Sequence, residues 1–298
     1  MPHPQILLGA HVSVAGGLPK GMERAAGYGC AVAQIFSKSA RTWKETEIAE
    51  ADALAFREAR KAAGVRALVS HAAYLINLAT PESAARKRSI SALIGEMKRS
   101  AALGAEWVVV HPGAHKGAGE AEGIRLVAEA VGHVLADSPT DSQQAPRLLL
   151  ETTAGQGTGV GHAFEQLGEM LNLLGWPDQV GVCLDTSHVF AAGYDIRTEA
   201  GYAETMESLD RTVGLDRLGV LHLNDSKTKL GSKVDRHAHI GRGEIGEAAF
   251  RRIMNDPRLA HVPKIIETPK GEGKDDPDWD RLNLGLLRGM VAGYSSNA

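Results

Sequence analysis

Acidic and histidine side chains stand at the ends of several short apolar segments. The segment VGVCLD is largely apolar until it ends in Asp185, and His188 follows three residues later. An ionised carboxylate at the end of a buried strand is costly unless a cation or hydrogen-bond donors compensate it. Five other apolar segments end in the same way, at His71, His111, Glu151, His222 and Glu267. A single residue of this kind is commonly a loop cap, but six together indicate a shared site.

Metal binding is the chemistry that these six residue types favour. Carboxylates that lie close together repel one another and raise one another's pKa unless cations are present. Imidazole and carboxylate without thiolate form the ligand set typical of catalytic Zn²⁺ or Mn²⁺. We therefore predict that the six side chains bind at least two metal ions, and that one of these ions compensates the charge of Asp185.

Three further candidate ligands lie outside the apolar segments. His188 follows the segment that ends at Asp185 and is expected to face a different ion. In VDRHAHIG, Asp235 and His237 alternate, so both side chains point the same way if the segment is extended. His188, Asp235 and His237 would form a three-ligand site with open positions, as catalytic zinc has. Spacing alone leaves His239 open as a replacement for His237.

The elements that would position these residues alternate between strand and helix. Eight short apolar segments suit buried strands: QILLGA, VAQIFS, RALVSH, EWVVVH, RLLLET, VGVCLD, LGVLHL and KIIET. Helix-forming residues at helical spacing lie between them. Continuous apolarity is typical of parallel strands covered by helices on both faces. We predict an α/β fold, a (β/α)8 TIM barrel in a single domain over residues 1–298, with a doubly wound open sheet as the rival. In the barrel, all six strand ends meet at the C-terminal mouth.

Composition limits the class of protein. The chain has 298 residues, 43% hydrophobic residues and a formal net charge of −3, so nucleic acid would have to bind a local basic patch. Two cysteines, no signal-peptide pattern and no apolar run near ~18 residues predict a cytoplasmic protein without a membrane segment. In GQGTGVG, Val160 replaces the third glycine of a dinucleotide-binding loop, so we expect no nucleotide cofactor.

Eight ordered motifs from Gly9 to Glu267 resemble the endonuclease IV family of apurinic/apyrimidinic endonucleases. These motifs are GAHVSVAGGL, SHAAYLINLA, HPGAH, ETTAGQG, CLDTSHVFAAGYD, HLNDSK, GSKVDRHAHIGRGEIG and IIET. The resemblance implies a (β/α)8 barrel with three Zn²⁺ ions, Mn²⁺ being the alternative at one or more sites. The implied ligands of the first ion are His71, His111 and Glu151. Those of the second are Glu151, Asp185, His222 and Glu267. Those of the third are His188, Asp235 and His237, which favours His237 over His239.

The resemblance also implies contacts between the mouth loops and DNA. The matching residues are Arg41, Tyr74 and Leu75. Side chains of these types can fill the gap left by a flipped-out nucleotide and offset the lost stacking. A packing role beneath the loop is the alternative for Tyr74 and Leu75. The pair Ala72–Ala73 stands where relatives often carry a polar residue, which puts the grip on the lesion strand in doubt.

The activity implied by the resemblance is hydrolysis of the phosphodiester 5′ to an abasic site in duplex DNA, which leaves a 3′-hydroxyl and a 5′-deoxyribose phosphate. Removal of 3′-blocking groups and action as a monomer are also expected. Paired metal ions make hydroxide available near neutral pH. Glu267 is expected to orient or deprotonate the water, and Glu151 to set the metal spacing. Phosphate would be attracted by basic residues between Asn224 and Glu244, namely Lys227, Lys229, Lys233, Arg236 and Arg242.

Two other functions compete with this prediction. A metal-dependent sugar isomerase of a related barrel type would also gather histidines and carboxylates at the mouth, but it needs only two ions and a closed pocket for a small polyol. A catalytically silent binder of damaged DNA would lack a ligand, whereas all nine ligand positions carry the expected residue type.

Overall fold

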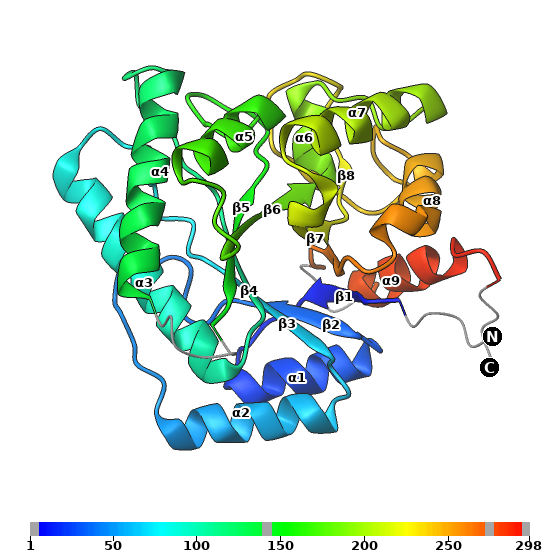
Figure 1. Cartoon of the computed structure of the whole chain (residues 1–298). Helices are drawn as coiled ribbons and strands as arrows, with labels where there is room; N and C mark the ends of the chain where they lie inside the picture. The colour runs from blue at the N-terminus through cyan, green and yellow to red at the C-terminus, as the bar shows by residue number, and fades with distance from the viewer. Residues whose placement is uncertain (1–5, 139–144, 272–276, 294–298) are drawn as a thin grey trace.

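Eight parallel strands close into a barrel in the computed structural model, which describes residues 6–138, 145–271 and 277–293 (Figure 1). The neighbour order around the barrel is β1-β10-β7-β6-β5-β4-β3-β2. The strands are β1 Leu8–His11, β2 Val32–Ile35, β3 Ala67–His71, β4 Trp107–Val110, β5 Arg147–Glu151, β6 Val180–Asp185, β7 Leu218–His222 and β10 Lys264–Ile266. Seven of these strands lie within predicted segments, and β1 overlaps QILLGA but extends one residue beyond it, to His11. The predicted barrel is therefore confirmed, and the open sheet is excluded.

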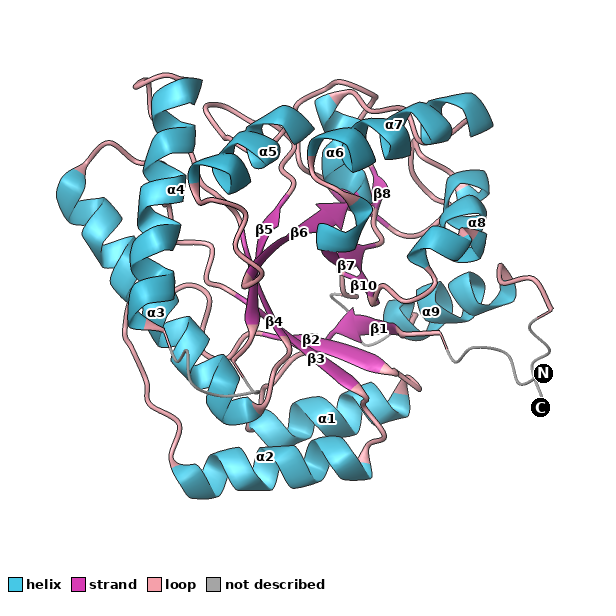
Figure 2. Ribbon diagram, viewed as in Figure 1, coloured by secondary structure: helices cyan, strands magenta, loops and turns pink. Residues whose placement is uncertain are grey.

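Helices surround the barrel and cover the outer face of its strands (Figure 2). They are α1 Leu18–Gly27, α2 Glu50–Ala62, α3 Ser83–Leu103, α4 Glu120–Asp137, α5 Phe164–Leu173, α6 Thr186–Ala192, α7 Glu199–Thr212, α8 Glu247–Asn255 and α9 Trp279–Gly289. Glycine ends α3, as is common for helices: Gly104 is left-handed, with φ 72°, and its N–H bonds back to the last turn. Among the described residues, no helix is long and apolar enough to cross a membrane.

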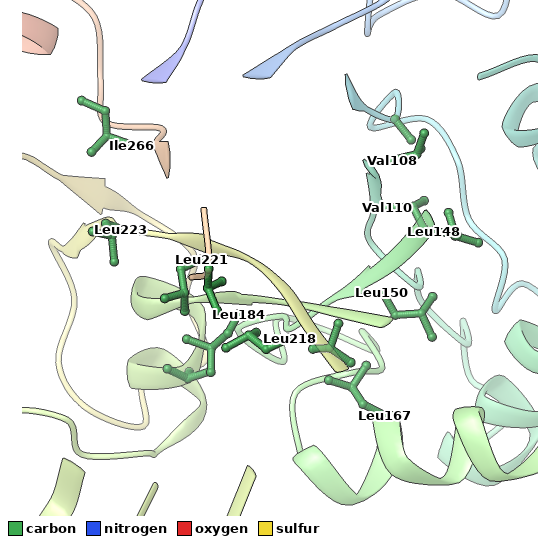
Figure 3. Packing of buried hydrophobic residues seen from close by; sticks show 14 of the residues in the cluster. Val108, Val110, Leu148, Leu150, Leu167, Leu184, Leu218, Leu221, Leu223 and Ile266 are labelled. Carbon is green, nitrogen blue, oxygen red and sulfur yellow. The ribbon is translucent and has the colours of Figure 1, made fainter. Parts of the chain in front are cut away.

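Alternation along each strand separates two apolar layers. Outward residues such as Leu148 and Leu150 of β5 belong to the same cluster as Leu167 of α5 (Figure 3). Inward residues form a smaller cluster inside the barrel, namely Val32, Ala67, Val69, Val109, Leu149, Cys183, Val220 and Ile265. β1 contributes Gly9 rather than a larger residue, because an added Cβ there would collide with the carbonyl oxygen of Val32. Both layers bury apolar area, which stabilises the barrel by roughly 25 cal/mol per Å².

The long connection after β7 is folded rather than irregular. Two short strands, β8 Asp225–Ser226 and β9 His237–Ala238, pair antiparallel within it. The buried Asp225 carboxylate accepts hydrogen bonds from the backbone N–H groups of Ser226, Gly243 and Ile245 at 2.8–3.0 Å. These bonds satisfy backbone donors of the connection and hold it against the barrel mouth.

Candidate metal centre

A two-residue step along the strands directs the predicted ligands into the mouth. Side chains two apart on a strand face the same way, so each residue of the inner apolar layer is followed by a side chain directed into the barrel above it. The pairs are Val32 and Gln34, Val69 and His71, Val109 and His111, Leu149 and Glu151, Cys183 and Asp185, Val220 and His222, and Ile265 and Glu267. The apolar layer closes the barrel floor beneath these polar groups.

Glu151 lies at the centre of the first group and is fully buried. Its Oε2 is 3.1 Å from His71 Nε2 and 2.9 Å from His111 Nε2. Its Oε1 is 3.0 Å from His222 Nδ1 and 3.4 Å from His188 Nδ1. The two carboxylate oxygens therefore face different sets of imidazoles, as a bridging ligand between two ions requires.

His222 joins Glu151 to the second group. Its Nδ1 is 3.1 Å from Glu267 Oε2 and 3.9 Å from Asp185 Oδ2. The other oxygen of Asp185 accepts from the backbone N–H groups of Ser187 and His188, at 2.7 and 3.0 Å. Donors thus compensate half of the Asp185 carboxylate at the start of α6, and the remaining oxygen faces the other candidate ligands.

Asp235 joins His188 and His237 in the third group. Its carboxylate oxygens lie 3.2 Å from His188 Nε2 and 3.2 Å from His237 Nε2. The side chains of Asp235 and His237 point the same way, although β9 includes only His237. His239 instead stacks on Trp279, with ring centroids 3.8 Å apart.

His188 of the third group also lies close to Asp185 of the second group. α6 begins directly after Asp185, and its first turn brings the His188 ring back toward that carboxylate. Ligand atoms of Asp185, His188 and His237 all lie within 4.8 Å of one another. Asp185 therefore lies between the second and third groups.

These distances fit zinc. Two ligand atoms that each lie ~2.1 Å from a tetrahedral Zn²⁺ are ~3.4 Å apart, and the contacts above span 2.9–3.9 Å. The Nε2 atom of His237 is buried and accepts or donates no hydrogen bond among the described residues. A metal ion would satisfy that atom.

The second ring nitrogen of each of four imidazoles is already used. Nδ1 of His71, His188 and His237 donates to the backbone carbonyls of Ala72, Thr152 and Glu267, at 2.7, 2.8 and 3.3 Å. For His222 the acceptor is a side chain, described below. Hydrogen bonds of this kind select the tautomer of metal-binding histidines and orient the rings, so the remaining nitrogens are available to ions.

The electrostatics of the cluster show how strongly these groups depend on one another. Burial would raise the pKa of Glu151, but His111 and His222 hold it well below its usual value. Burial would lower the pKa of His237, but Asp185 and Asp235 raise it to about 9. The pKa of His188 is also raised, against the effect of burial, by Asp185 and Asp235. Without metal, His188 and His237 therefore hold protons where ions would otherwise bind.

Cys183 is close to the cluster but is a poor candidate ligand. Its thiol lies within 4.8 Å of ligand atoms of Glu151 and His222. Burial raises its pKa to about 12, so it stays protonated near neutral pH. Cys183 is instead a packed thiol of the inner apolar layer.

Sequence reasoning missed three buried or half-buried polar residues of the centre, namely His11, Gln34 and Asn224. His11 Nδ1 lies 3.1 Å from Glu267 Oε1. The Asn224 amide donates to Asp185 Oδ2 at 2.6 Å and accepts from the Glu267 backbone N–H at 2.8 Å. The two-residue step identifies His11, after Gly9, and Gln34, after Val32. No comparable signal marks Asn224, which follows the end of β7 by two residues.

The predicted DNA-contact residues lie around the mouth. Tyr74 is 62% exposed, and its ring centroid lies 5.7 Å from that of His71 and 5.3 Å from that of Phe36. Leu75 is half-buried and Arg41 is exposed. A cavity of about 280 Å³ lies between Tyr74, His111, His188 and other mouth residues.

The loop that carries Arg41 is held against α3. Arg99 of α3 contacts Glu45 at 2.5 Å and donates to Ser37 Oγ at 2.8 Å. The guanidinium of Arg88 lies 4.4 Å from the ring centroid of Trp43. Both ends of the loop are therefore anchored, while Arg41 itself remains exposed to solvent.

All five predicted basic residues of the connection after β7 lie at least partly exposed: Lys227, Lys229, Lys233, Arg236 and Arg242. Arg242 also lies over the ring of Trp279, 4.7 Å from its centroid. These residues belong to the same connection as Asp235 and His237.

A closed parallel barrel with histidine and carboxylate ligands at its mouth defines a class of metal-dependent barrel. The family model described as xylose isomerase-like TIM barrel matches residues 22–288. The barrel also superimposes on D-psicose 3-epimerase with a TM-score of 0.70, covering 97% of this chain and 100% of that one, at 14% identity. That likeness supports the fold alone.

More similar proteins narrow the class. "Probable endonuclease 4" of Chloroflexus aurantiacus is 48% identical over 285 residues, 96% of this chain and 98% of the relative. The protein of that name from Geobacter sulfurreducens is 47% identical over 284 residues, 95% of this chain and 94% of the relative. The chain in the crystal structure of endonuclease IV from Thermus thermophilus is 39% identical in sequence. The two structures superimpose with a TM-score of 0.82, over 95% of this chain and 98% of that one. The chain belongs to the endonuclease IV family of DNA-cleaving hydrolases.

Proposed function

We propose that this enzyme is an abasic-site endonuclease. It hydrolyses the phosphodiester 5′ to an abasic nucleotide in duplex DNA, leaves a 3′-hydroxyl and a 5′-deoxyribose phosphate, removes 3′-blocking groups and acts as a monomer. The observation that carries the proposal is the convergence of Glu151 and eight other proposed ligand side chains at the barrel mouth, beside the exposed ring of Tyr74.

Three Zn²⁺ ions would occupy the three groups of ligands described above, with Mn²⁺ as the alternative at one or more of them. Such ions, when bound, lower the pKa of water and stabilise charge on phosphate oxygens. Glu151 sets their spacing because its two oxygens face different imidazoles. The ligands proposed are His71, His111, Glu151, Asp185, His188, His222, Asp235, His237 and Glu267.

Glu267 orients or deprotonates the attacking water in this proposal. It follows β10 directly, and only its Oε2 faces His222, because Oε1 contacts His11 and Gln34. A carboxylate held on one oxygen presents the other in a defined direction, which is what positioning of a water molecule requires.

The DNA would lie across the mouth. Tyr74, Leu75 and Arg41 would fill the gap left by the flipped abasic nucleotide. The basic residues after β7 would bind phosphates, so the KM for DNA should rise steeply with salt. A flat salt dependence would contradict this part of the proposal.

The decisive experiment uses a duplex with one tetrahydrofuran abasic analogue, which cannot undergo β-elimination. Protein is assayed before metal stripping, after stripping, and after addition of Zn²⁺ or Mn²⁺, and the product ends are tested by polymerase extension. We expect an extendable 3′-hydroxyl, lost on stripping and restored by metal, with no cleavage of an undamaged duplex. Fully metallated protein that does not cleave the analogue, but turns over a free ketose, would replace the proposal with sugar isomerisation.

A further inference from the structure

Gln34 is a fully buried amide among the candidate metal ligands. It lies on β2 with 0% exposure and is directed into the barrel above Val32 of the inner apolar layer. Gln34 is neither one of the nine proposed metal ligands nor one of the three proposed DNA-contact residues. A buried amide is stable only when both its donor and its acceptor are used, so its partners reveal what it does.

The Gln34 amide joins two candidate ligands of the second ion. Its Oε1 is 2.8 Å from His222 Nε2, and its Nε2 donates to Glu267 Oε1 at 2.5 Å. The same Nε2 lies 2.9 Å from His11 Nδ1. His222 is on β7 and Glu267 follows β10, so the amide reaches ligands on two other strands.

These contacts leave one atom of each ligand for an ion. Because Gln34 Oε1 can only accept, the neutral His222 imidazole carries its hydrogen on Nε2 and keeps the lone pair on Nδ1. That Nδ1 faces Glu151 Oε1 at 3.0 Å and Glu267 Oε2 at 3.1 Å. Glu267 is likewise bound through Oε1, which leaves Oε2 free.

His222 differs from the other oriented imidazoles in this respect. Backbone carbonyls accept from His71, His188 and His237. A backbone acceptor survives any side-chain substitution, whereas the acceptor of His222 depends on one residue type. The orientation of His222 can therefore be lost by changing Gln34 alone.

We infer that Gln34 is a positioning residue for the second metal ion, which selects the Nδ1-ligating tautomer of His222 and aims Oε2 of Glu267. The inference rests on the metal site of the proposed function, and it adds a residue that contacts neither the ion nor the DNA. Groups in this position typically alter metal affinity by about 10–100-fold.

The test compares Gln34→Met with wild type and with Asn283→Leu. Asn283 is a matched control because its amide is also buried and donates to Thr268 Oγ1 at 3.0 Å, but it contacts none of the nine proposed ligands. Zinc per chain is measured by elemental analysis, and zinc release is followed with a chromogenic chelator, in the absence of DNA. Thermal unfolding of the metal-free proteins reports any general loss of packing.

We expect Gln34→Met to release one zinc ion at least ~10-fold faster than wild type, and Asn283→Leu to release zinc as wild type does. In cleavage assays, kcat of Gln34→Met should fall with little change in KM, and excess Zn²⁺ should restore it. Gln34→Ala leaves room for a water molecule, so its rate of zinc release should lie between those of wild type and Gln34→Met. It replaces the methionine variant if that variant does not fold.

Zinc release unchanged from wild type in a folded Gln34 variant would overturn the inference while leaving abasic-site cleavage intact. Equal acceleration in Asn283→Leu would overturn it too, because loosened packing would then explain the effect. Wild-type protein that binds no zinc would overturn both this inference and the proposed metal mechanism.

Discussion

The two ends of the barrel bury charge in opposite ways, as β10 and the residue after it show. Lys264 begins the strand and is 2% exposed, and its ammonium donates to the backbone carbonyls of Leu259 and Val262 at 2.5 and 3.0 Å. Glu267 follows the strand at the mouth, among ionisable side chains of both signs. Charge at the floor is compensated by fixed backbone dipoles, whereas charge at the mouth is compensated by groups that metal ions can displace.

The larger of the two cavities at the barrel ends is not the one beside the candidate metal ligands. A cavity of about 550 Å³ lies at the Lys264 end, lined mainly by apolar residues such as Leu8, Cys30 and Met254. The mouth cavity measures about 280 Å³. Active sites of parallel barrels lie at the C-terminal ends of the strands because the loops and strand ends gather polar groups there. The smaller cavity is therefore the one that the proposed function uses.

Substitution of Glu267 and Lys264 should give the largest difference in activity between the mouth and the floor. Glu267→Gln should lower kcat for the abasic duplex by about 10²–10⁴-fold, since the amide cannot accept a proton. Lys264→Met should leave kcat unchanged, because it lies at the opposite end of the strand. Single-turnover cleavage of the tetrahydrofuran duplex measures both. A comparable loss in Lys264→Met, with its fold intact, would show that the two ends are coupled.

Zinc affinity of the metal-free protein should fall steeply as the pH falls. The carboxylates of the mouth raise the pKa of His237 to about 9, against burial, and the pKa values of His188 and His222 are also raised. These imidazoles must lose protons before they can bind an ion. Calorimetry in buffers of different ionisation enthalpy should therefore detect more than one proton released on filling the mouth at pH 7. Release of no protons would contradict the predicted set of histidine ligands.

Truncation of the mouth aromatic should have an intermediate effect. Tyr74→Ala removes an exposed ring, and stacking on a base or at a lesion is worth about 1–3 kcal/mol. We expect KM for the abasic duplex to rise roughly tenfold, with zinc content unchanged. Leu54→Ala is a suitable control, since Leu54 is also exposed but lies on α2. An equal effect of both variants would exclude a specific contact by Tyr74.

As the pH rises above neutral, Lys264 at the floor and His237 at the mouth should change the free energy of unfolding in opposite directions. Burial lowers the pKa of Lys264 to about 8, so between that value and its unfolded value of 10.5 the unfolded chain binds more protons and stability rises with pH. The raised pKa of His237 has the opposite sign: its contribution is present below 6.5 and is lost as the pH rises through about 9.

Metal-free Lys264→Met should therefore lose stability more steeply than metal-free wild type between pH 7 and 9.5. Urea unfolding at the two pH values measures the difference. An equal change in the free energy of unfolding of both proteins between the two pH values would show that Lys264 keeps an ordinary pKa. Its ammonium would then be better compensated than its burial indicates.

Much of the site could be predicted because the relevant pattern is local. Each ligand strand has an apolar run and a polar end, and alternation alone directs Glu151 or His222 inward above Leu149 or Val220. The same rule would have found Gln34, but a glutamine inside an apolar segment lacks the charge that draws attention to a carboxylate. The closeness of His188 to Asp185 was missed for another reason: it depends on the helix cap at the start of α6, which composition does not reveal.

By itself, the sequence determined the number of strands, the identity of the polar residues at their ends and the endonuclease IV motifs, because these depend on neighbours along the chain. Only the tertiary structure decided that Asp185 lies between two groups of ligands, that Arg99 anchors the Arg41 loop, and that Gln34 orients ligands on two other strands. The physical reason is barrel closure. Closure and stagger of the strands set distances between side chains up to 256 residues apart, as between His11 and Glu267, and no local pattern records those distances.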